Sequence, residues 1–344
     1  MKKFLKILGK VFAFLGVTVG MVFVCLLLTI TLICHGPSNS AKELFATTIL
    51  ETGQLKFLAN VFLSKDEIES IVSKNSLQDM NVEIDENLIK TNIDKTKELI
   101  EIHEVNGNNF EGKMMVVNDP SKISLATTYP WSEYGKELGV LVDDAGAIAG
   151  VNGGIYYSSG NKGGRPYGVT VSNGEVQDIS LGLSGLYLIG FDENNLLRII
   201  NLEGMNKKDV EKMLKEEKIR DAISFQEEAS DKNNHFVKLI INGEKRELNG
   251  MGSGANPRTA IGQRKDGSVL ILVTDGRGKN GHLGATASDL IEIMAEYGAV
   301  NAANLDGGSS SSMYYNKEYL MTSVTFYYSN SSWRLPTAFV VKDN

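Results

Sequence analysis

The chain has 344 residues, of which 42% are hydrophobic and 22% charged, so most of it can fold around hydrophobic cores. Its formal net charge of -7 excludes a protein built chiefly to clamp nucleic acid, and we expect no nucleic-acid partner. Its two cysteines, Cys25 and Cys34, are too few for a disulfide scaffold.

The N-terminus has the charge and hydropathy pattern of a membrane anchor. Residues 1–10 carry four lysines and no acid, and residues 11–34 contain no charged side chain. A helix of that length rises about 1.5 Å per residue and spans a hydrocarbon core of about 30 Å. We predict a cytoplasmic basic tail at 1–10, a transmembrane signal-anchor at 11–34 and an extracellular remainder. A cleaved signal peptide is the alternative, although the apolar stretch is long for one and no A-x-A site follows it.

The next segment, residues 35–105, has few glycines and many charges. Ser64 followed by Glu67 predicts a capped helix, because the residues after them are apolar at helical spacing. We predict a partly helical stalk or spacer without chemistry of its own, which precedes a domain at residues 106–344.

Short β-like runs and turns dominate that domain. Asn173-Gly174 and Asn242-Gly243 each follow an apolar run, and each predicts a type I′ hairpin turn. Residues 268–274, with the sequence SVLILVT, predict a strand that is buried on both faces. A last strand is expected at residues 337–341.

Helical periodicity returns three times within the domain. One helix is predicted at residues 131–145, a second after an Asn206 cap, and a third between Thr286 and Gly298. The predicted fold class is therefore α+β: a mixed β-sheet core with flanking helices, preceded by one N-terminal transmembrane helix.

Three predicted strands end in Asn or Asp followed by glycine. These junctions are Asn152-Gly153-Gly154, Asp275-Gly276 and Asp306-Gly307-Gly308. A helix joins the last two strands, and such a unit favours a parallel pair with a right-handed crossover. Parallel strands end at the same edge of a sheet, where open α/β sheets bind ligands. We therefore expect Asp275 and Asp306 to share one edge.

The residue types at these junctions fit a site that combines acid–base chemistry with the binding of an anion. Two carboxylates can divide acid and base roles when their surroundings separate their pKa values. The backbone N–H groups of Gly307, Gly308 and Ser309 can form an anion-binding nest, and Arg258 can bind a phosphate or carboxylate through two parallel hydrogen bonds.

Each of these features also has a plainer structural interpretation. An Asp-Gly pair can be only a turn, Arg258 can be a salt-bridge partner, and Asn152 can cap its own turn. No cofactor is required by the pattern, although a divalent cation such as calcium, held by Asp275, Asp306 and carbonyl oxygens, is compatible with it.

Five motifs, in this order along the chain, resemble the phosphodiester glycosidase domain family. They are Asn152-Gly-Gly-Ile-Tyr156, Asn256-Pro-Arg-Thr-Ala-Ile-Gly262, Thr274-Asp-Gly276, Gly284-Ala-Thr286 and Asn304-Leu-Asp-Gly-Gly-Ser-Ser310. The resemblance implies hydrolysis of a sugar-1-phosphodiester. By position Asp306 and Asp275 would line the site, and we predict them as the catalytic residues, with Asp275 either the partner of Asp306 or the group that orients Asn304 and Thr259. By position the resemblance implies a substrate-binding set of Asn152, Gly153, Gly154, Arg258, Thr259, Asn304, Gly307, Gly308 and Ser309.

The sequence therefore predicts an anchored extracellular hydrolase, on the surface of a Gram-positive bacterium, that acts on a glycosyl-phosphate linkage. The expected partners are the membrane and a cell-envelope or exopolysaccharide glycan. A non-catalytic glycan-binding or assembly protein and a glycosyl-phosphate transferase in polysaccharide export are the two alternatives.

Overall fold

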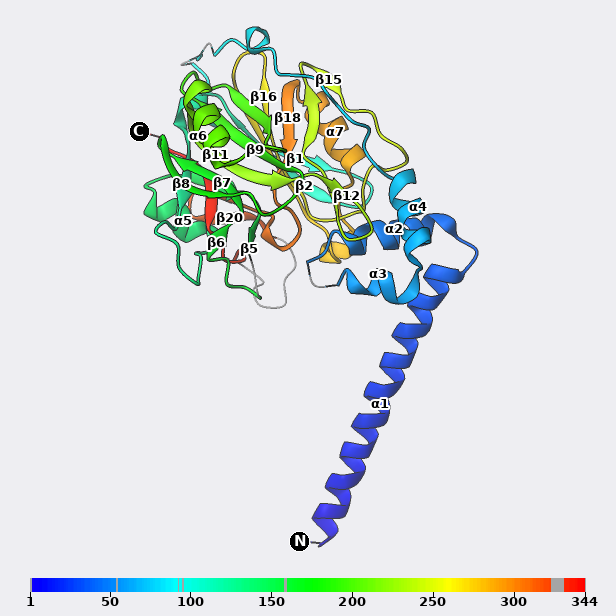
Figure 1. The fold of residues 1–344 in the computed structure, drawn as a ribbon. Coiled ribbons are helices and arrows are strands. Elements are labelled where there is room, and N and C mark those ends of the chain that lie inside the picture. Colours follow the sequence, from blue (N-terminus) through cyan, green and yellow to red (C-terminus); the bar gives the residue numbers. More distant parts are fainter. Residues whose placement is uncertain are drawn as a thin grey trace.

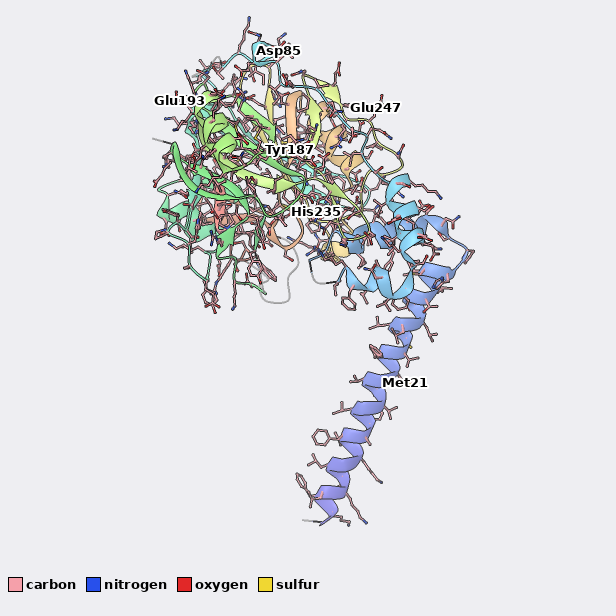
Figure 2. All side chains as sticks on the ribbon, viewed as in Figure 1. Met21, Asp85, Tyr187, Glu193, His235 and Glu247 are labelled. Atoms are coloured by element: carbon pink, nitrogen blue, oxygen red, sulfur yellow. The ribbon has the colours of Figure 1, made fainter. Side chains whose placement is uncertain are left out.

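The computed structural model describes residues 2–343, except 54, 92, 95, 158–159 and 323–330. Figure 1 shows a long N-terminal helix, a small group of helices at its C-terminal end, and a β-rich domain beside that group. The long helix, α1 (Lys2–His35), exposes its apolar side chains, and Met21 projects from it in Figure 2. It is long and apolar enough to cross a membrane, a property that it shares with signal sequences.

Three short helices follow α1 and form what we call the juxtamembrane unit (residues 39–74). They are α2 (Asn39–Leu50), α3 (Phe57–Phe62) and α4 (Lys65–Lys74). The predicted cap is confirmed, since the side chains and backbone of Ser64 and Glu67 form a reciprocal capping box at the start of α4. The unit has its own small core, in which Leu50 and Ile68 pack with Cys34 from the end of α1.

Several described residues between positions 75 and 99 are hydrogen-bonded to the β-rich domain. The amide of Gln78 donates to the Glu247 carbonyl over 2.8 Å, and the amide of Lys90 donates to the Lys265 carbonyl over 2.9 Å. The first strand of the domain then begins at Ile100, before the boundary at residue 106 that the sequence suggested. The spacer expected at residues 35–105 is therefore packed against the domain over much of its length.

A seven-stranded sheet carries most of the candidate site. Its strand order is β1-β2-β17-β16-β18-β14-β15, and all neighbours are antiparallel. The strands are β1 (Ile100–Asn106), β2 (Glu111–Val117), β14 (Lys238–Ile241), β15 (Glu244–Lys245), β16 (Thr259–Arg264), β17 (Val269–Thr274) and β18 (Ala299–Asn304).

This order corrects the predicted parallel pair. Strands β17 and β18 are not neighbours, because β16 forms a tight hairpin with β17 and thereby occupies the position between them. Both strands run antiparallel to β16 and hence in the same direction. Their C-terminal ends still lie at one edge of the sheet, which is the consequence on which the site prediction depended.

Two five-stranded antiparallel sheets complete the domain. One has the order β10-β9-β11-β7-β8 and the other β20-β19-β4-β21-β3. The first contains β7 (Gly168–Ser172), β8 (Glu175–Ser180), β9 (Leu186–Asp192), β10 (Leu197–Asn201) and β11 (Ile219–Gln226). The second contains β3 (Ile123–Thr127), β4 (Ala149–Asn152), β19 (Ser312–Tyr315), β20 (Glu318–Thr322) and β21 (Thr337–Val341).

Shorter elements connect these sheets. Two small hairpins are formed by β5 (Tyr156–Tyr157) with β6 (Arg165–Pro166) and by β12 (Glu228–Ala229) with β13 (Asn234–His235). Single 3-10 turns occur at η1 (Glu86–Leu88), η2 (Pro120–Lys122), η3 (Lys279–Gly281) and η4 (Gly308–Ser310). Both predicted type I′ turns are present, with positive φ at Asn173-Gly174 and at Asn242-Gly243.

The three large sheets turn their inner faces toward one core, and a helix covers the outer face of each. Helix α7 (Ala287–Glu296) lies on the seven-stranded sheet, α6 (Lys207–Glu216) on the β7–β11 sheet, and α5 (Leu138–Asp144) on the β3–β21 sheet. The predicted caps of α6 and α7 are confirmed. Helix α5 begins seven residues later than predicted, because Tyr134 and Lys136 form β-bridges with Gly163 and Leu335, which keep this stretch extended.

The burial of strand β17 on both faces explains why its sequence is a continuous run of apolar residues. Val269, Ile271 and Val273 point into the shared core, and the alternate residues point toward α7. The α+β class is therefore confirmed. Among the described residues, however, the paired strands are antiparallel and not of mixed direction.

Phe339 on β21 offers a test of this shared core. It is fully buried, and its ring meets that of Phe191 edge to face, with the centroids 6.2 Å apart. We expect Phe339→Ala to lower the free energy of unfolding by about 4 kcal/mol, measured by urea denaturation in detergent. The exposed Val176→Thr serves as control, with an expected change within about 0.5 kcal/mol. An equal effect of the two substitutions would contradict the position of this core.

Candidate functional site

The candidate site lies where three strands of the seven-stranded sheet meet one edge. Strand β17 ends at Thr274 and β18 ends at Asn304, while the antiparallel β16 begins at Thr259. The register pairs Thr259 with Val273 and Ala260 with Asn304. The loop before β16 and the loops after β17 and β18 therefore emerge side by side.

The segment 256–259 joins the two aspartate loops. Backbone hydrogen bonds link Thr274 N–H to the Arg258 carbonyl, Leu305 N–H to the Thr259 carbonyl and Gly308 N–H to the Pro257 carbonyl. A Cβ added at Gly307 would lie 2.9 Å from that Pro257 carbonyl oxygen, so the close approach requires a glycine there.

Asn152 brings the third predicted junction to the same place. It ends β4, it is fully buried, and both ends of its amide are engaged. Its Nδ2 donates to the Asp306 carbonyl over 2.6 Å, and its Oδ1 accepts from Thr259 Oγ1 over 2.8 Å and from Ser312 N–H over 3.2 Å. Asn152 and Thr259 thus fix the Asp306 loop from behind, with their polar atoms directed at protein groups.

Asn152 can therefore be tested as a positioning residue. Asn152→Ala removes three hydrogen bonds and leaves the Asp306 loop without its side-chain support. We expect a loss of roughly 2–4 kcal/mol of stability, measured by urea denaturation. Asn87→Ala, in an exposed turn, is the control and should change stability by less than about 0.5 kcal/mol.

The next two glycines serve packing. A Cβ on Gly153 would lie 2.3 Å from Thr337 Oγ1, and one on Gly154 would lie 2.3 Å from the Ser224 carbonyl oxygen. Because those contacts are made by β21 and β11, both glycines lie between sheets and let the chain pass. Substrate contact by Gly153 and Gly154 stays a prediction.

Asp306 has the electrostatic setting expected of an acid–base group. Removal from water raises the pKa of its carboxyl to about 7, against hydrogen bonds from Ser310 and Gly307 and the positive charge of Arg277, which lower it. Tyr156 lies beside it, with its hydroxyl 3.0 Å from Ser310 Oγ. Burial, and then the Asp306 charge, raise the pKa of Tyr156, so this side chain stays a neutral phenol.

Arg277 is a site residue that the sequence analysis missed. Its Nη1 donates to Ser309 Oγ over 2.7 Å, and a Cβ added to Gly308 would lie 2.6 Å from its Nη2. Its backbone adopts φ +56°, an unusual conformation for arginine. The available signal was its position directly after Asp275-Gly276 at the end of a strand.

Arg258, in contrast, is enclosed by protein. It is 5% exposed; its Nε donates to the Ala285 carbonyl, and its Nη2 donates to Glu51, to Ser253 Oγ and to the Gly254 carbonyl. Its guanidinium also lies over the ring of Phe236, 4.9 Å from the centroid. The structure thus engages Arg258 in the salt bridge that was its alternative interpretation, and phosphate binding by Arg258 stays a prediction.

Asp275 is buried and holds a neighbouring loop. Its Oδ1 accepts from the Glu111 amide over 2.8 Å, and its Oδ2 lies 2.9 Å from His282 Nδ1. The ligand atoms of Glu111, Asp275 and His282 lie within 4.8 Å of one another, so these three residues form a group that could hold a cation. The structure thus places Glu111 and His282 beside Asp275, and a cation shared by Asp275 and Asp306, which the sequence allowed, stays untested.

Several buried polar atoms around this edge have no hydrogen-bond partner among the described residues. They are Arg277 Nε, Asn304 Oδ1, Asn256 Oδ1 and Ser311 Oγ. Buried polar groups are normally paired, and a group of unpaired ones calls for a specific explanation. A polar ligand or bound water at this edge is the simplest one. Asn304, whose Nδ2 donates to the Phe236 carbonyl, keeps its Oδ1 free for such a contact.

Comparison with known proteins bears on this geometry. The family model described as phosphodiester glycosidase matches residues 145–342. A solved structure of the zebrafish N-acetylglucosamine-1-phosphodiester α-N-acetylglucosaminidase catalytic domain, auto-inhibited by its pro-peptide, is similar with a TM-score of 0.53 and 18% identity. The similarity covers 74% of this chain and 87% of that one. It establishes a shared fold.

Two further similarities are more limited. A 56-residue stretch is 46% identical to the SPbeta prophage-derived uncharacterized protein YomE of Bacillus subtilis, and it covers 16% of this chain and 8% of that protein. The crystal structure of a hypothetical protein from Synechocystis is similar over 70% of this chain and 61% of that one, with 15% identity and a TM-score of 0.46.

Proposed function

The chain belongs to the phosphodiester glycosidase family, and from that premise we propose that it is an anchored extracellular hydrolase of sugar-1-phosphodiesters. Its substrate would be a glycosyl-phosphate linkage in a cell-envelope or exopolysaccharide glycan. The observation that carries the proposal is the contact of Arg277 with the Asp306 loop, where Arg277 Nη1 donates to Ser309 Oγ over 2.7 Å, beside a carboxyl whose pKa is raised by burial.

The phosphate side of the linkage would face Arg277 and the Gly307–Ser309 backbone. A phosphodiester becomes a good leaving group once its charge is neutralised, so it needs little proton donation. Arg277 takes the role that the sequence gave to Arg258, because Arg258 is already neutralised by Glu51. The four unpaired buried polar atoms support a polar ligand at the same place.

The sugar side would face Asp306. The ionised carboxylate would accept a proton from water as the water oxygen attacks the anomeric carbon, while the bond from that carbon to the phosphate oxygen breaks. The same carboxylate would stabilise positive charge on the sugar ring in the transition state. Asp275 would act indirectly, since its Oδ2 lies 2.9 Å from His282 Nδ1 in the loop that carries Arg277, and its Oδ1 accepts from the Glu111 amide at the start of β2.

Helix α1 supports anchoring through its length and apolar surface. Only residues 36–38 separate it from α2, and the juxtamembrane unit contacts the loop of residues 254–258. An uncleaved anchor would therefore hold the site near the outer surface of the bilayer. A substrate presented at that surface fits this arrangement.

The proposal is tested with the full-length chain in detergent micelles. We expect release of free sugar from an α-linked sugar-1-phosphodiester, followed by chromatography, without any added acceptor. Product that forms only when an acceptor alcohol is supplied would identify a transferase. Saturable binding without product would identify a glycan-binding protein, and either result would overturn the hydrolase proposal.

A further inference from the structure

A buried carboxylate from the juxtamembrane unit reaches the edge of the candidate site. Glu51 follows the last residue of α2, and its side chain is 3% exposed. Its Oε2 accepts from Arg258 Nη2 over 2.5 Å and from Asn256 Nδ2 over 2.9 Å. Its Oε1 accepts from the Gly254 amide over 2.8 Å and from Asn234 Nδ2 over 3.0 Å. Both oxygens are thus used by the β-rich domain, 180 or more residues away in the sequence.

Burying a charge is costly unless it is paired and hydrogen-bonded. Burial raises the pKa of Glu51, and its contacts with Arg258, Gly254 and Asn256 oppose that rise. The number of these contacts indicates a built interaction in which each partner satisfies the other. Removing Glu51 would leave the Arg258 charge buried without its counter-ion.

The helix that carries Glu51 fits tightly against the same loop. A Cβ added at Gly254 would lie 2.3 Å from the backbone nitrogen of Thr48, so α2 can approach only because residue 254 is glycine. The Ala255 amide donates to Thr48 Oγ1 over 3.1 Å. A second contact joins Lys56 to Asn233, in the loop before His235, which Figure 2 labels on the side of the domain nearest this unit.

A short path connects Glu51 to the reacting groups. Glu51 holds Asn256 and Arg258, which flank Pro257. The Pro257 carbonyl accepts the Gly308 amide over 2.8 Å and lies against Gly307. Glu51 therefore influences the backbone that follows Asp306 through two successive contacts: its own with Asn256 and Arg258, and that of Pro257 with the glycines.

We propose that Glu51 is a positioning residue for this site, and that the juxtamembrane unit is a working part of the enzyme. The unit lies outside residues 145–342, which the family model matches. By neutralising Arg258, Glu51 leaves Arg277 as the cation available to an anionic substrate. The effect on turnover rests on the proposed function, whereas the effect on loop order does not.

The kinetic test uses the full-length chain in detergent and the variants Glu51→Gln and Glu51→Ala. We expect kcat/KM to fall by about 100-fold for Glu51→Ala, mainly through kcat, because a misplaced site loses reaction geometry more than binding. Glu51→Gln, which keeps the shape and one acceptor oxygen, should lose less. Combining Glu51→Ala with Arg258→Met should cost little more than either change alone, since both act through one contact.

The matched control is Glu67→Ala in the same unit. Glu67 caps α4 and accepts from Lys42, and it makes no hydrogen bond to the 254–258 loop. The Glu67→Ala substitution weakens the unit but removes none of the contacts that connect Glu51 to the 306–308 loop, so kcat/KM should stay within about 3-fold of wild type. A loss at Glu67→Ala equal to that at Glu51→Ala would reduce Glu51 to a general structural residue and overturn the proposal.

Hydrogen exchange supplies a readout that needs no activity. Glu51→Gln should speed amide exchange in peptides that cover residues 252–258 and 306–311, and leave β17 protected as in wild type. Unchanged exchange at residues 306–311 would overturn the positioning role. A variant more active than wild type would also overturn it, because Glu51 would then be an anion that competes with substrate. If wild type hydrolyses no phosphodiester while the exchange result holds, the proposed function fails and the positioning of the loop stands.

Discussion

Asp306→Asn in the full-length chain is expected to lower kcat by about 10³-fold or more and, at pH 8, to stabilise the fold. The loss follows because the amide cannot take a proton from water or carry negative charge opposite a developing sugar cation. Both kcat, from product release, and the urea midpoint are measured. Asp144→Asn, which breaks an exposed ion pair with Lys136, is the control and should leave both within error.

The stability gain has a definite pH dependence. Burial raises the pKa of Asp306 to about 7 from an ordinary value of 3.8, so the folded chain holds a proton there that the unfolded chain releases. Ionised Asp306 therefore costs stability, and that cost is absent below about pH 4, grows between pH 4 and 7 and is complete above pH 7. At pH 8 the asparagine variant should be more stable by roughly 2–4 kcal/mol, and at pH 4 by little.

Wild-type turnover should also depend on the ionisation of Asp306. The ionised form, which lowers the stability of the fold, is the form that is proposed to be active. Because the proposed role requires the ionised carboxylate, kcat/KM should rise with pH through a midpoint near 7, the value for the chain without substrate. A variant that kept more than a tenth of wild-type turnover would contradict the assignment of Asp306. So would a kcat/KM that falls with rising pH over this range, since Asp306 would then act as a proton donor.

Local sequence signals predicted the elements of this fold well. The capping residues Ser64, Asn206 and Thr286 begin helices, and Asn173 and Asn242 take the positive φ that a type I′ turn requires. Each signal depends on contacts within a few residues, so the sequence alone contains it. The order of strands is not contained in such short segments: β16 forms a hairpin with β17, but its other neighbour, β18, follows only after helix α7, and no short-range pattern specifies that pairing.

The same difference between local and long-range contacts explains which features of the candidate site the sequence predicted. The common edge of Asp275 and Asp306 was predictable, because strand direction follows from the connecting helix and survives the insertion of β16. The choice between Arg258 and Arg277 was not. Both stand near a strand end, and only the distant Glu51 decides which guanidinium is neutralised by the protein. Because Arg258 and Glu51 are 207 residues apart in the chain, no local sequence pattern predicts that they pair.

Arg277→Ala is expected to lower kcat/KM for a sugar-1-phosphodiester by about 10²- to 10³-fold. The guanidinium lies against Ser309 and Gly308, where the phosphate is proposed to bind, and Arg258, the other arginine at this edge, is already paired with Glu51. Arg277→Lys keeps the charge and loses the planar fork, so its loss should be smaller. Both variants retain a side chain at φ +56°, which holds backbone strain nearly constant between them.

Two measurements separate this role from general damage to the site. Arg277 lowers the pKa of Asp306, so Arg277→Ala should move the rising limb of the kcat/KM profile to higher pH, while Arg277→Lys leaves it near 7. The penalty should also depend on the leaving group: a neutral aryl α-glycoside of the same sugar should lose far less than the phosphodiester. Arg165→Lys, in an exposed pair with Asp178, is the control for loss of a guanidinium elsewhere. Equal losses on the charged and neutral substrates would show that Arg277 supports the structure of the site and does not bind phosphate.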